Sequence, residues 1–489
     1  MCREMLGSRP LIIASNRGPV EYHIESDGSL SAQRGGGGMV TAVMAAARVL
    51  PATWVASAMT EGDREAAGRS KRAVLEVPDS DMRVRFVTVP PPVYQRHYYV
   101  LCNPLLWFIQ HFMWNTPRTP NIGRAVYEAW DNGYVPVNKA IADAVVAQAK
   151  QAPEPPYVLL QDYHLYLAPA MIRRAAPEAT LLHFTHIPWP GPRYWGILPE
   201  FMRRRIHADL CAADIVGLQT VSDARNFLHC CDAILPGATV DYQKREISFE
   251  GRTTRVRHYP ISIDTDGLLR FSRSLEVRAA TDKLQPLTGE QTIVRVDRAE
   301  PSKNIVRGLR AFELFLERHE DFRKKVNLLQ CLVPSRGELG LYQTYADEIF
   351  EIVDSINDHY GDIEWQPVRV FYEENYPQAI AAMTLYDVLM VNPVIDGMNL
   401  VSKEGPLVNA RDGVLILSET AGSYEQMAEH VLPVAPTDIE GTVRALHRAL
   451  TMPQRERKRR AQALKRLVQE QDIAVWLESQ FRDLTALPR

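Results

Sequence analysis

Short apolar segments alternate with helical patterns along almost the whole chain, and this alternation restricts the fold more than any other feature. The apolar segments are rich in valine, isoleucine and leucine, which is typical of strands buried on both faces of a parallel sheet. Strands that alternate with helices predict an α/β fold in which helices cover such a sheet. The expected strands form two series. The first comprises 11–14, 53–56, 84–89, 157–160, 181–185 and 215–218, and the second comprises 292–296, 326–332, 368–371, 388–391 and 414–417.

The length of 489 residues indicates two domains, because a single hydrophobic core stops growing well below that size. An extended stretch at 255–264 separates the two series of strands, and its proline limits the local conformations. We therefore expect one domain at 1–265 and a second at 266–471, with a cleft between them. The last helical pattern is amphipathic and contains Trp476, so it has to dock on a core.

Composition and charge exclude several classes of protein. Hydrophobic residues make up 46% of the chain and charged residues 24%, as in a soluble globular protein. A net charge of −3 leaves no basic excess for nucleic acid, and we interpret the basic run at 455–460 as a solvated helix face. No apolar stretch approaches the ~18 residues that span a bilayer. The N-terminus lacks the apolar core of a signal peptide, so we expect a cytoplasmic protein without membrane or nucleic-acid partners.

The residues that most often bind metals show no convincing pattern. The six cysteines have no CxxC spacing, which indicates reduced, buried thiols. Two DxD triplets, Asp79-Ser80-Asp81 and Asp264-Thr265-Asp266, do not follow a predicted strand, and such triplets arise by chance. The histidines show no HExxH spacing. We therefore expect neither a metal nor a cofactor.

The strand at 388–391 leads into the segment DGMNLVSKE at 396–404. It supplies a carboxylate at Asp396, a glycine that lets backbone approach a ligand, a row of amide N–H groups and a second carboxylate at Glu404. Turns of this kind lie at the carboxyl edge of parallel sheets, where open α/β folds bind ligands. The segment predicts a nucleotide-sugar pocket in which Asp396 binds sugar hydroxyls, the amides bind phosphate and Glu404 binds ribose. The alternative is an ordinary strand–turn–helix connection with a polar N-terminus.

A second candidate loop lies near the N-terminus. The strand at 11–14 runs into Ser15-Asn16-Arg17, and four consecutive glycines at 35–38 precede an alanine-rich helix. These glycines leave the first amides of that helix accessible to a phosphate or a sugar. The pattern is not GxGxxG and no Walker lysine follows, which disfavours dinucleotide and P-loop chemistry. A flexible loop is the alternative.

Polar residues also follow two neighbouring strands of the first series. Asp162 comes after the strand at 157–160, and His186 comes after the strand at 181–185 and before a stiff Pro-Trp-Pro sequence. Matching strand ends place both side chains on one rim of the predicted cleft. Single histidines are more often structural than catalytic, but the pair favours a site.

Cations follow two strands of the second series. Arg298 and Lys303 lie between the strand at 292–296 and a helix expected to start near Ser302. Arg336 follows the strand at 326–332. Cations beside a helix N-terminus stabilise the negative charge that builds up on a departing nucleoside diphosphate. Each cation alone could be an ordinary surface charge, but all three at strand ends indicate a diphosphate site.

Taken in order, these motifs resemble the trehalose-6-phosphate synthase family of retaining glycosyltransferases. The segments that carry the resemblance are SNR at 15–17, GGM at 37–39, YYVLCNPLLW at 98–107, DYHL at 162–165, HIPWP at 186–190, GLQT at 217–220, RAEPSK at 298–303, PSRGE at 334–338, DGMNLVSKE at 396–404 and LSETAG at 417–422. The resemblance extends over nearly the whole chain. It implies a GT-B fold, in which two Rossmann-like domains face a deep cleft. It also implies that the C-terminal helix at 472–489 crosses back to the N-terminal domain.

The resemblance assigns acceptor binding to the N-terminal domain. The residues that would bind the phosphate of the acceptor are Arg17, Tyr98 and Arg336. Its glucose would lie against Trp107 and Asp162.

The resemblance assigns nucleotide-sugar binding to the C-terminal domain. The diphosphate would be held by Arg298 and Lys303, with the amides of Asn399, Leu400 and Val401 completing the phosphate cradle and Glu404 on the ribose. Gly38 would lie under the donor phosphates, while His186 and Asp396 would contact hydroxyls of the donor sugar. The residues expected to act in catalysis are Asp162, His186, Arg298, Lys303 and Asp396.

The implied reaction transfers glucose from a nucleoside-diphosphate glucose to the anomeric oxygen of glucose 6-phosphate with retention, without a metal. Retaining hydrolases use two carboxylates in a double displacement. Members of this family are thought instead to substitute on the same face, with the leaving phosphate oxygen taking the acceptor proton. Asp396 is therefore interpreted as a positioning group, and catalysis as orientation plus phosphate electrostatics. We also expect a homo-oligomer.

The sequence departs from the family pattern at two places beside the expected nucleotide pocket. The familiar RLDYSKG becomes Arg298-Ala299-Glu300-Pro301-Ser302-Lys303-Asn304, which keeps the arginine-to-lysine spacing and loses the glycine. Gly405-Pro406-Leu407 replaces the usual alanine-rich start of the helix after Glu404. The base of the donor (uridine, guanosine or adenosine) consequently stays open.

Two alternatives to the trehalose-phosphate synthase also stay open. One is a related synthase with another acceptor, either glycerol 3-phosphate or an aminocyclitol phosphate joined through a C–N bond as in pseudo-glycosyltransferases. The other is a catalytically silent sugar-phosphate sensor, against which the complete set of expected site residues argues.

Overall fold

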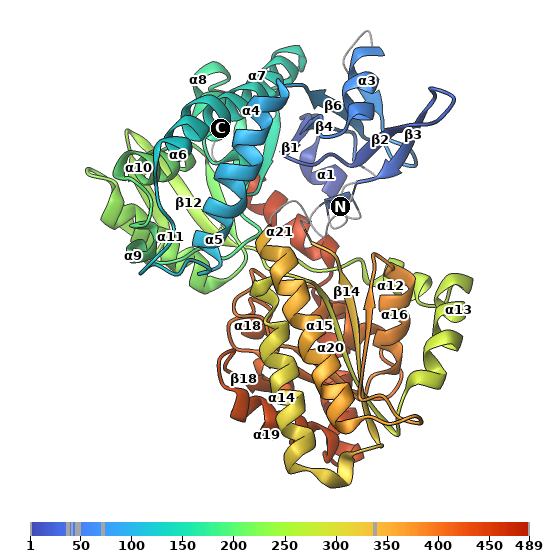
Figure 1. Ribbon diagram of the computed structural model, residues 1–489. Helices are drawn as coiled ribbons and strands as arrows, with labels where there is room; N and C mark the ends of the chain where they lie inside the picture. Colours follow the sequence, from blue (N-terminus) through green and yellow to red (C-terminus); the bar gives the residue numbers. More distant parts are fainter. Residues whose placement is uncertain are drawn as a thin grey trace. The chain divides into compact units, whose positions relative to one another are not determined.

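The computed structural model describes residues 2–35, 40, 43–44, 50–69, 74–335 and 340–487, and the chain divides into two compact units (Figure 1). Unit 1 comprises Met1–Ile261 and Ile473–Arg489, and unit 2 comprises Ser262–Asp472. Each unit contains a sheet of mainly parallel strands, so the predicted α/β class is confirmed.

The sheet of unit 1 is ten-stranded within the described part, in the order β10-β11-β12-β9-β8-β7-β1-β4-β6-β5. Its parallel strands are β1 (Leu11–Ser15), β4 (Ala52–Ser57), β6 (Arg83–Val87), β7 (Tyr157–Gln161), β8 (Thr180–Phe184), β9 (Ile215–Leu218) and β12 (Arg252–His258). Antiparallel edge strands are β5 (Leu75–Glu76), β10 (Thr239–Asp241) and β11 (Glu246–Phe249). All six strands of the first predicted series are present, because apolar segments such as β1 and β7 are buried along their whole length.

Helices of unit 1 follow these strands. They are α1 (Cys2–Leu6), α3 (Glu61–Arg69), α4 (Pro91–Gln95), α5 (Trp107–Gln110), α6 (Arg124–Ala129), α7 (Val135–Gln151), α8 (Ala168–Ala175), α9 (Pro192–Trp195), α10 (Glu200–Leu210), α11 (Val221–Ile234) and α21 (Ile473–Thr485). Two π-helical segments, Arg96–Leu106 and Trp130–Tyr134, continue α4 and α6. A separate hairpin is formed by β2 (Val20–Ile24) and β3 (Leu30–Arg34).

The C-terminal helix α21 belongs to unit 1, as predicted. Its Trp476 is 3% exposed and meets the ring of Phe184, at the end of β8, edge to face at 5.4 Å. The hydroxyl of Tyr259 donates a hydrogen bond of 2.6 Å to Asp483 of the same helix. The apolar face recognised in the sequence therefore docks on the core of the N-terminal sheet.

Unit 2 contains a six-stranded parallel sheet in the order β15-β14-β13-β16-β17-β18. Its strands are β13 (Gln291–Arg298), β14 (Val326–Val333), β15 (Val368–Tyr372), β16 (Val388–Val391), β17 (Val414–Ser418) and β18 (Leu432–Val434). Neighbouring strand residues enter different cores: Leu328 packs into one hydrophobic cluster and Leu329 into the other. Side chains alternate across a strand, so this sheet is buried on both faces.

The helices of unit 2 supply these two clusters. They are α12 (Thr265–Phe271), α13 (Leu275–Leu284), α14 (Ile305–Arg318), α15 (Gly340–Tyr360), α16 (Tyr376–Leu385), α17 (Val401–Val408), α18 (Tyr424–Met427), α19 (Ile439–Leu450) and α20 (Gln454–Glu470). Helices α14, α15 and α19 contribute to the first cluster, and α13, α16, α17 and α20 to the second. Among the described residues, no helix is both long enough and apolar enough to cross a membrane.

The basic run at 455–460 is only partly solvated, which corrects its interpretation as an exposed helix face. On α20, Arg457 forms an ion pair of 2.9 Å with Asp387, just before β16. Arg460 donates to the carbonyl of Val431, just before β18. Two of the cations thus fasten α20 to the sheet, while Arg455, Lys458 and Arg459 are exposed.

Replacing Trp476 with alanine is expected to lower the free energy of unfolding of unit 1 by about 3–5 kcal/mol, the usual cost of emptying a large aromatic site. The neighbouring Val475, 42% exposed on the same helix, provides the control. Its replacement by alanine is expected to change stability by less than about 0.5 kcal/mol. Denaturant unfolding of both variants measures the difference, and equal losses would contradict the docking of α21 through Trp476.

Candidate active site

Loops that follow β13 and β16 meet in unit 2 through an ion pair. Lys303 Nζ lies 2.5 Å from Asp396 Oδ2, although the two residues are 93 positions apart in the chain. Asn399 donates to the same carboxylate oxygen through Nδ2 at 3.1 Å. The side chains of Lys303 and Asp396 are 14% and 16% exposed. The predicted proximity of these loops follows because parallel strands end at one edge of the sheet.

Buried charges surround this ion pair. Burial opposes a positive charge on Lys303, but attraction from Asp396, Asp297 and Glu300 outweighs it, so the pKa of Lys303 is raised. Asp297, at the end of β13, has its pKa raised to about 6 by burial, against the opposing attraction of Arg295 and Lys303. Arg295 is itself 1% exposed, lies 3.6 Å from Asp297 and donates to the carbonyl oxygen of Lys303 at 3.2 Å.

Arg298 is the more accessible of the two predicted diphosphate-binding cations. Its guanidinium is 50% exposed and lies 3.0 Å from a carboxylate oxygen of Glu300, which is fully buried. The hydroxyl of Ser335, just beyond β14, donates 2.7 Å to the same oxygen of Glu300. The ion pair with Glu300 therefore orients the side chain of Arg298 and leaves part of this side chain in contact with solvent.

The helix after Lys303 begins later than predicted. Ser302 belongs to a 3-10 turn at Pro301–Lys303, and α14 starts at Ile305. The amides of Ile305 and Val306 donate to the hydroxyl of Tyr345, at 2.8 Å and 3.3 Å. These two amides already have an acceptor, so the predicted anion site of this loop depends on the side chains of Arg298 and Lys303.

Asn304 explains the missing glycine of the loop. Its φ of 60° and ψ of 35° are left-handed, a conformation that glycine adopts without strain and asparagine tolerates better than most residues. Its side-chain amide donates to the carbonyl oxygens of Asn392 at 2.9 Å and Pro436 at 2.7 Å. The substitution therefore keeps the turn and adds hydrogen bonds to the ends of two other strands.

The N-terminus of α17 has the expected features of a phosphate site. Asn399 is left-handed, with φ of 74°, and its side-chain oxygen accepts from the amide of Ser402 at 3.0 Å. The amides of Leu400 and Val401 donate no hydrogen bond within the described part of the chain. Such amides at a helix start attract anions. Burial raises the pKa of Glu404, in the first turn of this helix, to about 7.

Asp162 and His186 lie together in unit 1, at the ends of the adjacent strands β7 and β8. The carboxylate of Asp162 accepts from the backbone amide of His186 at 3.1 Å. Asp162 has φ of 72°, and its own amide donates to the carbonyl of Phe184 at 2.7 Å. The imidazole of His186 is neutral, because burial, followed by the nearby His183, lowers its pKa to about 3.

The predicted acceptor residues of unit 1 occupy different depths. Arg17, beyond β1, forms an ion pair of 3.0 Å with Glu21. Burial opposes the charge of Arg17, but attraction from Tyr98 and Glu21 outweighs it, so the pKa of Arg17 is raised. Tyr98 stacks on His164 with 5.9 Å between ring centroids. Trp107 is only 3% exposed and stacks on His111 at 3.8 Å. Arg17 and Tyr98 thus present polar atoms together, while Trp107 is mostly enclosed.

Two predicted site residues, Gly38 and Arg336, lie outside the described residues. Six of the other predicted residues lie in three pairs: Arg17 near Tyr98, Asp162 with His186, and Lys303 with Asp396. Sequence reasoning missed Gln161, Glu300 and the side chain of Asn399, which contact His186, Arg298 and Asp396. Gln161 and Glu300 lie one and two residues from the predicted Asp162 and Arg298, and Asn399 was predicted only through its backbone amide. Closeness in sequence to a predicted residue is the signal that could have revealed them.

Among the described residues, no group of three or more histidine, cysteine, aspartate or glutamate side chains could hold a metal ion. The DxD triplet at 264–266 has a local role, because Asp264 Oδ1 accepts from the amide of Gly267 and caps α12.

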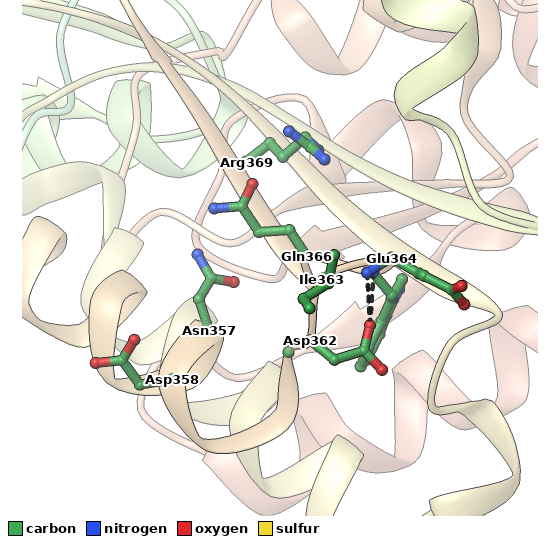
Figure 2. Close-up of a pocket in the computed structure, with 9 residues that line it drawn as sticks. Asn357, Asp358, Asp362, Ile363, Glu364, Gln366 and Arg369 are labelled. Atoms are coloured by element: carbon green, nitrogen blue, oxygen red, sulfur yellow. Dashed lines mark hydrogen bonds between the residues drawn. The ribbon is translucent and has the colours of Figure 1, made fainter.

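A cavity of about 420 Å³ lies elsewhere in unit 2 (Figure 2). Its lining residues, 357–358, 361–366 and 369, come from the end of α15, the loop that follows and β15. Asp362 organises that loop by accepting from the amides of Glu364 and Trp365, each at 2.9 Å. The loop precedes β15, whereas Lys303 and Asp396 follow their strands, so the cavity is separate from the candidate site.

Comparison with known proteins agrees with this geometry. A model of the sequence family described as Glycosyltransferase family 20 matches residues 9–486. The validamine 7-phosphate valienyltransferase of Streptomyces hygroscopicus subsp. jinggangensis is 29% identical, over 99% of this chain and 95% of its own length. An alpha,alpha-trehalose-phosphate synthase [UDP-forming] of Aspergillus fumigatus is 30% identical, over 98% and 97%. The crystal structure of such a synthase from Burkholderia xenovorans, in complex with glucose-6-phosphate, superposes with a TM-score of 0.82 at 27% identity and covers 98% of this chain and 100% of that one.

The chain therefore belongs to glycosyltransferase family 20 and is a glycosyltransferase enzyme. Its resemblance to the trehalose-6-phosphate synthases, and the GT-B fold class expected from it, are confirmed by these relatives and structures.

The left-handed turn at Asn304 predicts an unusual order of stability. Asn304→Ala and Asn304→Gly both lose the hydrogen bonds to Asn392 and Pro436, but alanine also strains the turn, so it is expected to cost about 1 kcal/mol more than glycine. At Arg310, which is 53% exposed on α14, the order is expected to reverse because glycine weakens a helix. Urea unfolding of the four variants measures this, and the same order at both positions would contradict it.

Proposed function

We propose that the protein is an alpha,alpha-trehalose-6-phosphate synthase, which transfers glucose from a nucleoside-diphosphate glucose to glucose 6-phosphate with retention and without a metal. The observation that carries the proposal is the joint placement of Lys303, Asp396 and Asn399 at the carboxyl edge of the sheet of unit 2. The relative from Aspergillus fumigatus is UDP-forming, which makes uridine the first base to test. The Burkholderia xenovorans relative binds glucose-6-phosphate, which supports the acceptor.

On the donor side, two cations and a helix N-terminus would receive the diphosphate. Arg298 and Lys303 each have one carboxylate partner in Glu300 and Asp396, and both retain further N–H donors for phosphate oxygens. The amides of Leu400 and Val401 and the dipole of α17 add to this positive potential. Glu404 would accept from ribose hydroxyls, with Gly38 under the phosphates.

On the acceptor side, charged and aromatic groups would bind a sugar phosphate. Arg17 lies close enough to Tyr98 to interact with it electrostatically, and both would hold the phosphate together with Arg336. Asp162 would accept from a glucose hydroxyl, while Trp107, which is 3% exposed, would support the residues that line the pocket. The carboxylate of Asp162 is fixed by the backbone of His186, so its direction is set before the sugar binds.

The geometry favours a same-face substitution over a covalent intermediate. The carboxylate of Asp396 is held by Lys303 at 2.5 Å and by Asn399 at 3.1 Å, and both donors reduce its nucleophilicity. The same contacts suit a group that positions a sugar hydroxyl. The bond from the anomeric carbon to the diphosphate breaks while the acceptor oxygen bonds to that carbon, and the released phosphate oxygen takes the acceptor proton. Arg298 and Lys303 stabilise the charge that develops on the diphosphate.

One observation supports a second candidate function. The valienyltransferase matches this chain at 29% identity over 99% of its length, close to the 30% of the Aspergillus fumigatus synthase. Its printed acceptor is validamine 7-phosphate, an aminocyclitol phosphate, so a cyclitol acceptor is the alternative. A phosphate clamp built on Arg17 and Tyr98 suits either acceptor, because both carry a phosphate ester.

A matrix assay tests the proposal. Purified protein is incubated without added metal with UDP-, GDP- or ADP-glucose and with glucose 6-phosphate, glycerol 3-phosphate or an aminocyclitol phosphate, and products are identified by NMR. We expect trehalose 6-phosphate with one preferred donor. A product only with the aminocyclitol acceptor would support the alternative, and donor binding without any product would indicate a sensor.

Arg298→Ala and Lys303→Ala are each expected to reduce turnover by about a hundredfold or more, the scale of losing one preorganised charge-stabilising group. Lys324 provides a matched control, because it pairs with Asp362 at the same 2.5 Å as Lys303 with Asp396 but lies 63% exposed. Lys324→Ala is expected to leave turnover unchanged. Near-normal turnover of the Arg298 and Lys303 variants would exclude their assignment to the diphosphate.

Donor affinity is expected to depend on pH through Glu404, whose pKa is raised to about 7 by burial. A carboxylate accepts ribose hydroxyls better than a carboxyl group, and the charged form increases as the pH rises through 7. Calorimetry with UDP-glucose should therefore show affinity rising roughly tenfold between pH 6 and pH 8. Glu404→Gln should bind more weakly at pH 8 and show little pH dependence. An unchanged slope in this variant would remove Glu404 from the ribose site.

A further inference from the structure

Gln161 is the last residue of β7 and is 1% exposed. Gln161 is paired with Phe184 in the parallel register of β7 and β8, and Phe184 lies two residues before His186 in the chain. Its side-chain oxygen lies 2.8 Å from Nε2 of His186. Gln161 and Asp162 thus hold His186 at two points: Asp162 accepts from its backbone amide, and Gln161 contacts its ring.

The contact with Gln161 determines which ring nitrogen carries the proton. An amide oxygen can only accept a hydrogen bond, so the nitrogen of His186 that faces it has to be the donor. A neutral imidazole has a single N–H group, and Nδ1 is then left as an acceptor. The ring nitrogens of His186 make no other hydrogen bond among the described residues.

Packing fixes the plane of this ring. Phe184 meets the imidazole edge to face at 4.7 Å, and Trp476 of α21 lies 6.2 Å from it. The carbonyl oxygen of His186 accepts from Gln219, whose own oxygen accepts from the amide of Ile261 at 3.0 Å. Backbone and ring are therefore held separately, by Gln219 and by Gln161.

We propose that Gln161 is a positioning residue that fixes His186 in the Nε2–H tautomer, so that Nδ1 is presented to the substrate as a hydrogen-bond acceptor. An acceptor nitrogen pairs with a hydroxyl and repels the unprotonated oxygens of a phosphate diester. His186 then selects a hydroxyl of the donor sugar and discriminates against donors that lack it, because a buried acceptor without its donor is costly. This substrate class rests on the proposed function, whereas the tautomer does not.

The tautomer is measurable without activity. In protein labelled with 15N-histidine at pH 8, the ring signals of His186 are identified by their loss in His186→Asn. We expect a protonated Nε2 and an unprotonated Nδ1 in the wild type. Gln161→Glu keeps an acceptor at the same place and is expected to keep this pattern, whereas Gln161→Leu is expected to lose it. Gln219→Leu, an equally buried glutamine on the backbone of His186, is the matched control and should keep the pattern.

Kinetics then test the role in selection. A set of UDP-glucose analogues, each lacking one sugar hydroxyl, is compared in the wild type and in Gln161→Leu. We expect the variant to lower kcat/KM for UDP-glucose by about tenfold, the worth of one well-placed hydrogen bond. For the analogue that lacks the hydroxyl bound by Nδ1, the wild type and Gln161→Leu should have the same kcat/KM, because neither protein can form that hydrogen bond. A merely structural role would lower kcat/KM for every donor by the same factor.

The outcomes separate the two proposals. A protonated Nδ1 in the wild type, or an unchanged tautomer in Gln161→Leu, would overturn the role of Gln161 whatever the activity. Uniform losses across the analogues would overturn the selection of a hydroxyl. If no nucleotide sugar is turned over, the proposed function fails, and the NMR result still decides the tautomer.

Discussion

The ion pair between Lys303 and Asp396 is the interaction on which the candidate site of unit 2 depends. A buried pair is stabilising only when other groups satisfy its remaining bonding capacity, since desolvation of two charges costs several kcal/mol. Here Asn399 donates to Asp396, and Arg295 donates to the backbone of Lys303. Arg295, Arg298 and Lys303 are balanced by Asp297, Glu300 and Asp396, so the edge of the sheet holds six charges that sum to zero. The ion pairs therefore orient the cations Arg298 and Lys303.

Most strands could be predicted from the sequence because they are buried on both faces. The segment 388–391, for example, contains no polar residue. The edge strands β10 and β11 and the short β18 were missed, since they carry charges, alternate in exposure or contain Pro433. The start of α14 was placed too early because proline and serine at 301 and 302 imitate a helix start, while the structure uses them in a 3-10 turn. The start of α14 depends on Tyr345, which is distant in sequence and accepts from the amides of Ile305 and Val306.

The candidate site shows a similar division. Motif spacing was sufficient to pair Asp162 with His186, because parallel strands bring their ends to one edge. The ion pair of Lys303 with Asp396 was not predicted, although the resemblance placed both residues at the donor site. Burial could not be predicted from the motifs: Arg298 and Lys303 were given the same role, but their side chains are 50% and 14% exposed. The asparagine at position 304 looked like a departure from the family pattern, but its backbone is left-handed, a conformation that glycine also adopts without strain.

Asn304 also changes how this loop can evolve. A glycine would leave the turn attached to its own strand alone, but the asparagine side chain ties it to the backbone of Asn392 and Pro436, at the ends of β16 and β18. The neighbouring Lys303 is therefore braced by segments from three places in the chain. Substitutions near position 436, which is distant from position 303 in the sequence, are therefore expected to affect the position of Lys303. The effects of such substitutions are expected to depend on whether residue 304 is asparagine or glycine.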